Sequence, residues 1–198
     1  MYRVIGNGAS RTIRVTWMLE ELGVPYAHGL AHPRSPEARQ HNPSGKVPIL
    51  LVDGAAITDS AAILTYLADA HGQFTSPAGS IRRAQQDGML FRILDELDAV
   101  LWTGSRHKFV LPENLRMPAI TDSLKWEFAR TCGFFDQLLA DRPFACGEEM
   151  TVPDFILTHC LRWATNSDFP VEGDALTAYR DRMSDRPAFV KARELIWV

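Results

Sequence analysis

The chain has 198 residues, of which 46% are hydrophobic and 23% are charged, and its net charge at neutral pH is −3. This composition is typical of globular proteins and argues against intrinsic disorder. The 21 lysine and arginine residues are scattered along the chain, which argues against the clustered positive surface that binds nucleic acid.

The sequence shows no sign of a targeting signal or a membrane span. The first ten residues hold no apolar stretch of signal-peptide length, and no uncharged run reaches the roughly 18 residues of a membrane helix. We therefore expect a cytoplasmic protein with no membrane partner.

Three cysteines lie in the second half of the chain, at Cys132, Cys146 and Cys160. Their odd number and the absence of a CxxC spacing argue against a disulfide framework, a zinc site and a dithiol redox centre. We expect all three to be buried free thiols, and we expect no metal.

The first half of the chain alternates between strand and helix patterns. The predicted elements, in chain order, are a strand at 2–5, a helix from Ser10 to Leu22, a strand at 26–30, a loop at 32–42 with at most a short helix, two strands at 47–52 and 55–58, and a helix from Asp59 or Ser60 to about Ala70. Gly23 and Pro25 mark the end of the first helix, and Asp53-Gly54 is a strong hairpin signal. The order is therefore βαβ followed by ββα.

The second half has long helical periods and no convincing strand. Residues 74–80 have neither periodicity nor bulk, so we place a linker at 75–82, between a first domain at 1–74 and an all-helical domain at 83–198. Helices are expected at 81–102, 119–139, 152–165, 175–183 and 187–195. The first of these has more apolar positions than one packing seam requires, which favours a homodimer; they are Leu90, Leu94, Leu97 and Leu101.

The run Asn-Pro-Ser-Gly-Lys-Val-Pro-Ile-Leu at 42–50, followed by Asp59-Ser60, resembles the cytosolic glutathione transferases, in particular the bacterial type with a serine at the thiol-activating position. Stretches at 18–26, 151–154 and 186–189 agree with this resemblance, which spans nearly the whole chain. It implies an α/β thioredoxin-like N-terminal domain, an all-α C-terminal helical bundle domain, and a homodimer with one glutathione site per subunit.

The resemblance assigns one part of the glutathione site to Val47 and Pro48. The Val47–Pro48 peptide is expected to be cis, as it is in the family, and the backbone N–H and C=O of Val47 would pair with the cysteinyl part of glutathione like an added strand. A proline at the start of a strand costs no ladder hydrogen bond, so the same residues also fit an ordinary beginning of a strand.

Asp59 and Ser60 begin a predicted helix, where backbone N–H groups and the positive end of the helix dipole attract a carboxylate. The resemblance assigns this place to the γ-glutamyl end of glutathione, with Ser60 on the carboxylate and Asp59 near the α-amino group. Either residue would also serve as a helix cap alone. Lys46 and Arg34 are the expected partners of the glycine carboxylate, although a solvated surface charge explains Arg34 nearly as well.

Thr151 and Asp154 have the spacing of a capping box, and Pro153 suits the first turn of a helix. The pattern predicts a helix that begins at Val152. We interpret Asp154 as a residue that stabilises the fold and not as a catalytic acid.

A glutathione transferase must hold the thiol of glutathione as the thiolate, which is the nucleophile. Ser10 aligns with the serine or cysteine that family members carry after their first strand, so the resemblance assigns it the catalytic role. The tyrosine and cysteine variants of the family are excluded, because no tyrosine ends the first strand and no cysteine precedes Cys132. Asn7 and Thr12 are alternative donors, and Ser10 would also serve as a plain helix cap.

The second substrate is expected against the helical domain. The aromatic candidates for the wall of an apolar electrophile pocket are Trp102, His107, Phe109, Trp126 and Trp163. Each of them, taken singly, is better explained by burial in a hydrophobic core.

The leading hypothesis is an enzyme, a glutathione S-transferase that uses glutathione as co-substrate against an apolar electrophile. A glutathione-dependent isomerase or dehalogenase would use the same thiolate, and a non-catalytic binding or scaffold protein would keep only the fold. The presence of Ser10, Asp59 and Ser60 argues against the scaffold.

Overall fold

The computed structural model describes residues 1–194 and forms two compact units. One unit comprises Met1–Ala78 together with the C-terminal segment from Ser184, and the other comprises Gly79–Met183. The sequence-based division placed everything from residue 83 onward in the helical domain. In the structure the segment from Ser184 groups with the first unit instead, because its helix α9 (Pro187–Glu194) packs against α1 (Thr12–Leu22).

The first unit is built on a mixed four-stranded sheet with the strand order β2-β1-β3-β4. The parallel pair β1–β2 is joined through α1, and β3 runs antiparallel to both β1 and β4. This is the predicted βαβ and ββα order, and it confirms the thioredoxin-like fold. The strands are β1 (Tyr2–Ile5), β2 (Tyr26–Gly29), β3 (Ile49–Val52) and β4 (Ala55–Thr58).

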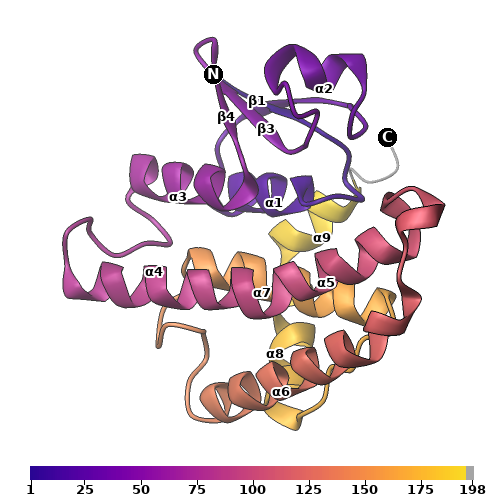
Figure 1. Ribbon diagram of the computed structural model, residues 1–198. Helices are drawn as coiled ribbons and strands as arrows, with labels where there is room; N and C mark the ends of the chain where they lie inside the picture. Colours follow the sequence, from indigo (N-terminus) through magenta and orange to yellow (C-terminus); the bar gives the residue numbers. More distant parts are fainter. Residues whose placement is uncertain (195–198) are drawn as a thin grey trace. The chain divides into compact units, whose positions relative to one another are not determined.

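The hairpin between β3 and β4 turns at Asp53 and Gly54, as predicted, and both residues have positive φ angles, of 48° and 89°. β3 begins at Ile49 and not at residue 47, because Pro48 has no N–H to donate to the sheet. Helices α1 and α3 (Ser60–His71) lie on one face of the sheet (Figure 1). The short helix α2 (Pro36–His41) covers the other face through Ala38, which packs with Ile5 and Ile49.

Helix α1 is buried along most of its length, because the sheet, α3 and α9 all contact it. The Trp17 ring meets the Phe189 ring of α9 edge-on, with 4.8 Å between centroids. Arg186 binds Glu21 through both carboxylate oxygens, at 2.5 and 2.7 Å. The Arg-Pro-Ala-Phe stretch near the end of the chain therefore anchors α9 to α1, while Leu195 of the predicted helix lies outside the described residues.

The second unit is all-helical, as predicted. The helices are α4 (Ile81–Ile93), a π-helical turn η1 (Leu94–Asp98), α5 (Ala99–Ser105), a second π-helical turn η2 (Arg106–Val110), the short 3₁₀ turns η3 (Glu113–Leu115) and η4 (Pro118–Ile120), α6 (Thr121–Ala140), α7 (Val152–Asn166) and α8 (Asp174–Ser184). The helix expected at 81–102 thus continues to Val110 through two π turns. Leu90, Leu97 and Leu101 are buried within this unit, so these three are not available to a partner as the pattern had suggested.

The capping box at the start of α7 is confirmed. Asp154 is fully buried and accepts four hydrogen bonds: from the backbone N–H groups of Ala145 and Thr151 (both 2.8 Å), from the Tyr179 hydroxyl (2.8 Å) and from the Thr151 hydroxyl (3.2 Å). Burial raises the pKa of Asp154, and the four donors lower it again in part. The carboxylate holds α7, the segment before it and α8 together.

All three cysteines are free thiols, and Cys132 and Cys160 are buried as expected. Burial raises the pKa of the Cys132 thiol to about 12. The prediction is wrong for Cys146, which is exposed. It sits in a tight turn closed by two backbone hydrogen bonds of 3.1 Å between Phe144 and Gly147, and such a turn exposes the side chain at its tip.

Residues 1–194 contain neither a cluster of metal-binding side chains nor a helix that could cross a membrane. No group of three or more His, Cys, Asp and Glu side chains in this range could hold a metal ion. None of the helices in the same range combines the length and the apolar character needed to cross a membrane.

Candidate functional site

Three connecting segments of the first unit meet at the same end of the strands of its sheet. Ile5, the last residue of β1, pairs with Ile49, the first residue of β3, and Ile49 pairs with Thr58, the last residue of β4. The loop after β1, the loop before β3 and the start of α3 therefore lie next to one another. These are the segments that carry the predicted residues Ser10, Val47–Pro48 and Asp59–Ser60.

Ser10 lies in a turn between β1 and α1. Its hydroxyl donates to the Asn7 carbonyl oxygen (2.7 Å), lies 2.8 Å from the Thr12 hydroxyl, and accepts a hydrogen bond from the Thr12 N–H (3.2 Å). α1 begins at Thr12 with Arg11 as its cap residue, so the helix starts two residues later than predicted. Ser10 therefore organises the turn before the helix.

Of the two neighbouring hydroxyls, that of Ser10 lies nearer the surface. Thr12 is fully buried, whereas Ser10 is half-buried. The Thr12 hydroxyl packs against Gly6, and a Cβ atom at Gly6 would collide with it. Asn7, the other alternative donor, has its amide nitrogen 3.2 Å from the ring of His32. Ser10 and Asn7 are thus both half-buried, whereas Thr12 is enclosed.

The Val47–Pro48 peptide is cis, which confirms that prediction. Val47 is half-buried against the Ile5–Ile49 cluster. The ladder of β3 covers only Ile49–Val52, so the backbone N–H and C=O of Val47 lie beyond the paired part of the strand.

The loops that hold Arg34 and Lys46 are tied together. The Arg34 N–H donates to the Gly45 carbonyl (2.7 Å), and Gly45 has a φ of 68°, where a Cβ atom would lie 2.8 Å from the Arg34 Cα. The Asn42 amide donates to the Lys46 carbonyl (2.9 Å). Both cationic side chains are exposed, and the close approach at Gly45 brings their backbones together.

The start of α3 combines a helix cap with a buried hydroxyl. Asp59, with a φ of 72°, accepts hydrogen bonds at Oδ1 from the N–H groups of Ala61 (2.8 Å) and Ala62 (3.3 Å). The first N–H groups of a helix have no hydrogen-bond partner within the helix. Asp59 accepts hydrogen bonds from two of these groups in α3, and the N–H group that precedes them in the chain is that of Ser60. Ser60 is 4% exposed.

One residue that touches this site was not predicted from the sequence. Arg14 of α1 is 1% exposed and donates from Nη1 to the Ser60 hydroxyl oxygen (3.1 Å). The available signal was a charged residue within a helix whose neighbours, Ile13 and Val15, are both apolar. A buried guanidinium needs polar partners, and the Ser60 hydroxyl is one of them.

The predicted electrophile-pocket residues all lie in the second unit. Trp102 on α5, His107 on η2 and Trp163 on α7 are half-buried, whereas Phe109 on η2 is 63% exposed. His107 accepts a hydrogen bond from the Met117 N–H (3.1 Å). Trp126 is 64% exposed on α6 under the Arg130 guanidinium, so it belongs neither to a core nor to an enclosed wall.

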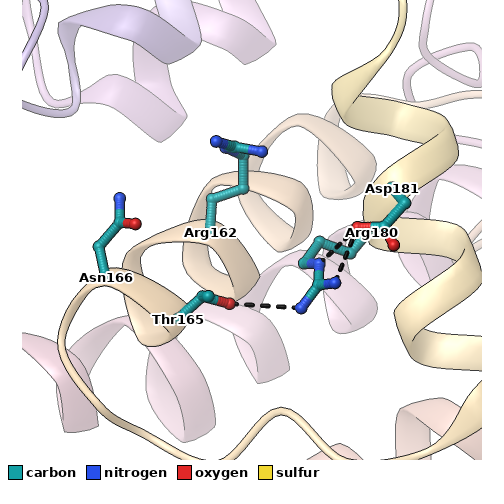
Figure 2. A pocket seen from close by; sticks show the side chains of 5 residues that line it. All are labelled: Arg162, Thr165, Asn166, Arg180 and Asp181. Atoms are coloured by element: carbon teal, nitrogen blue, oxygen red, sulfur yellow. Dashed lines mark hydrogen bonds and ion pairs between the residues drawn. The ribbon is translucent and has the colours of Figure 1, made fainter.

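A separate cavity of about 160 Å³ lies between α7 and α8 (Figure 2). The Arg180 side chain reaches from α8 to Thr165 (3.4 Å) and to Asp181 (2.8 Å). The residues that line it are all polar or charged and include none of the predicted pocket residues; they are Arg162, Thr165, Asn166, Arg180 and Asp181. Such a cavity does not fit an apolar electrophile.

The fold places the protein in a class with a thioredoxin-like domain, a cis-proline before the third strand and an all-helical second unit. The profile of the glutathione S-transferase N-terminal domain matches residues 10–70. Glutathione S-transferase GstA of Escherichia coli O157:H7 is 32% identical over 154 residues, which cover 74% of this chain and 71% of the relative. The chain belongs to the glutathione S-transferase family.

Two further proteins extend this similarity. The hematopoietic prostaglandin D synthase of Gallus gallus is 28% identical over 84% of this chain and 81% of its own length. The crystal structure of a glutathione transferase homolog from Lodderomyces elongisporus, with two GSH per subunit, has a TM-score of 0.84 at 20% identity, and the match covers 98% of this chain and 97% of that one. At this identity the structural match shows the shared fold.

Proposed function

We propose that the protein is a glutathione transferase that holds glutathione as the thiolate for attack on an apolar electrophilic small molecule. The observation that carries the proposal is the convergence of the Ser10 turn, the Val47–Pro48 peptide and the Asp59–Ser60 helix start at one edge of the sheet. A tripeptide with an anionic group at each end and a thiol between them suits such a row of donors.

Each part of glutathione has a proposed partner within residues 1–74. The N–H and hydroxyl of Ser60 bind the γ-glutamyl carboxylate at the helix start. The Asp59 Oδ2 atom faces the α-amino group, because Oδ1 is taken by the helix. The backbone of Val47, beside Pro48, pairs with the cysteinyl residue, and Lys46 with Arg34 attracts the glycine carboxylate.

Ser10 is the proposed catalytic residue. A free thiol has a pKa near ~8.5 and is mostly protonated at neutral pH. A hydrogen bond to a charged group contributes about 1.5–3 kcal/mol, and about 1.4 kcal/mol corresponds to one pKa unit. A single hydroxyl that donates to the sulfur can therefore lower the thiol pKa by about one to two units.

The proposed electrophile site belongs to the helical domain, at 83–198 in the sequence-based division, and uses Trp102, His107, Phe109 and Trp163. Aromatic side chains suit a flat apolar substrate. We further propose a cytoplasmic role in detoxification. A glutathione-dependent isomerase or dehalogenase remains the alternative, favoured by the similarity to a relative that is named as a synthase and not as a transferase.

Glutathione is expected to stabilise the protein against heat. A ligand at one hundred times its Kd adds about 2.7 kcal/mol to the free energy of unfolding, so a thermal-shift titration should give a saturable rise in Tm. The dipeptide Cys-Gly, which lacks the γ-glutamyl group, is the control and should give little shift. A titration to 10 mM glutathione without a rise in Tm would overturn the proposed function.

We also propose that the protein is a homodimer. Ile81 and Phe91 on α4 are apolar side chains with 79% and 64% exposure, and a second copy of the chain would cover them. Light scattering at micromolar concentration should return about twice the chain mass of 22.2 kDa. Phe91→Asp should lower this mass toward one chain, whereas Met117→Asp, at a residue with 59% exposure in the same unit, should not. A wild-type mass near one chain contradicts the proposal.

A further inference from the structure

Arg14 is a buried cation that reaches from one helix of the site to another. It lies on α1, two residues after Thr12, whose hydroxyl contacts Ser10. The Nη1 atom of Arg14 donates a hydrogen bond to the Ser60 hydroxyl at the start of α3. Arg14 is 1% exposed and Ser60 is 4% exposed. The contact joins residues that are 46 positions apart in the sequence.

The direction of this hydrogen bond determines what the Ser60 hydroxyl can do. A guanidinium has donors only, whereas a hydroxyl has one hydrogen and two lone pairs. Because Arg14 donates to Ser60, the Ser60 hydrogen cannot point at Arg14 and is left for an acceptor elsewhere. A donor that itself accepts from a cation is polarised and binds an anion more strongly.

A neighbouring buried polar residue on the same helix behaves differently. The hydroxyl of Thr16, 2% exposed, donates to carbonyl oxygens of its own helix, at Ile13 (3.2 Å) and Thr12 (3.4 Å). The Arg14 guanidinium instead donates a hydrogen bond to Ser60 at the start of α3, where the γ-glutamyl carboxylate of glutathione is expected.

We infer that Arg14 is a positioning residue for the γ-glutamyl carboxylate of glutathione, and that it acts by orienting and polarising the hydroxyl of Ser60. The inference rests on the proposed function. It predicts that Arg14 contributes to affinity for one particular carboxylate of the ligand and not to the ligand as a whole.

The test compares binding of two ligands to the full-length protein by calorimetry. One ligand is glutathione, and the other is 4-aminobutanoyl-Cys-Gly, which is glutathione without the γ-glutamyl carboxylate. Arg14→Met and Ser60→Ala should each weaken glutathione binding about ten- to thirtyfold and change binding of the analogue by less than about twofold. The double variant should lose no more than the worse single variant, because both substitutions break the same interaction.

Two further variants separate positioning from damage to α1. Thr16→Val removes a buried hydroxyl from the same helix without touching Ser60, and should leave both affinities unchanged. Arg14→Lys keeps the cation and a donor, and should restore part of the affinity lost in Arg14→Met. If Arg14→Met does not fold, Arg14→Lys and Ser60→Ala are compared in the same way, and both should lose affinity for glutathione alone.

The outcomes distinguish the inference from the function on which it rests. If wild-type protein binds neither ligand, the proposed function is overturned and the inference with it. If wild-type protein binds glutathione but the Arg14 variants weaken both ligands equally, or the double variant shows the sum of the two single losses, only the role of Arg14 is overturned.

Discussion

Asp154→Ala is expected to destabilise the protein by about 3–5 kcal/mol, as is typical when one partner of a buried polar network is removed. The substitution leaves four donors without their acceptor, namely two backbone N–H groups and the hydroxyls of Tyr179 and Thr151. Each buried donor without a partner costs about 1–3 kcal/mol. Removing the buried charge offsets part of this sum.

The loss is large because a domain of this size is stable by only about 5–15 kcal/mol. Urea unfolding followed by circular dichroism measures this loss of stability. The urea concentration at the midpoint should fall, with little change in the slope of the free energy of unfolding against urea concentration. Tyr179→Phe removes one of the four donors and leaves the other three in place, so it should cost only about 1 kcal/mol.

Asp122→Ala is the matched control for this measurement. Asp122 also lies in the first turn of a helix of the second unit, but it is exposed on α6. A surface substitution of this kind changes stability by less than about 0.5 kcal/mol. Equal midpoints for Asp154→Ala and Asp122→Ala would show that the buried network contributes nothing, and our account of Asp154 would fail.

Features that depend on neighbours in the sequence were predicted well. The cis peptide before Pro48 was expected from the family resemblance. The hairpin at Asp53-Gly54 and the capping box at Thr151 each involve residues within a few positions of one another. Local backbone geometry decides such features, so the residue types alone carry the information. The strand and helix order follows from the same local patterns.

Features that depend on distant partners were not predicted. The Arg14–Ser60 contact spans 46 positions and the Arg186–Glu21 ion pair spans 165. The leucines of α4, η1 and α5 were interpreted as a surface for a partner, yet Leu90 and Leu97 are buried within their own unit. Apolar periodicity shows that one face of a helix is buried, but it does not say against what.

Ser10→Ala is expected to slow turnover of a chlorinated nitrobenzene test substrate by about ten- to a thousandfold, which corresponds to the loss of one charge-assisted donor, about 1.4–4 kcal/mol. The hydrogen bond from Ser10 strengthens as charge develops on the sulfur, so its loss should appear in the rate and in a raised pKa of the bound thiol. A rate profile against pH and the ultraviolet absorbance of the thiolate measure the two quantities.

Glutathione affinity should change much less than the rate. The proposed binding groups, Ser60 and Lys46 among them, hold the two ends of the tripeptide, and Ser10 meets only the thiol. Dissociation measured at pH 6, where the bound thiol is largely protonated, should therefore be nearly the same for Ser10→Ala and wild type. Ser80→Ala, which removes a serine hydroxyl that caps α4 in the other unit (3.1 Å to the Arg83 N–H), is the control and should keep both rate and pKa.

The structure adds a second donor to this comparison, because the Thr12 hydroxyl lies 2.8 Å from that of Ser10. In wild type the Ser10 hydrogen is directed at the Asn7 carbonyl, and it must turn to the sulfur when the thiolate forms. If Ser10 is the donor, Thr12→Val should cost less than Ser10→Ala, since Thr12 acts only by supporting Ser10. If Ser10→Ala leaves both rate and pKa intact while Thr12→Val or Asn7→Ala changes them, the donor is one of those two residues. If Ser10→Ala unfolds the protein instead, the hydroxyl serves only the turn before α1.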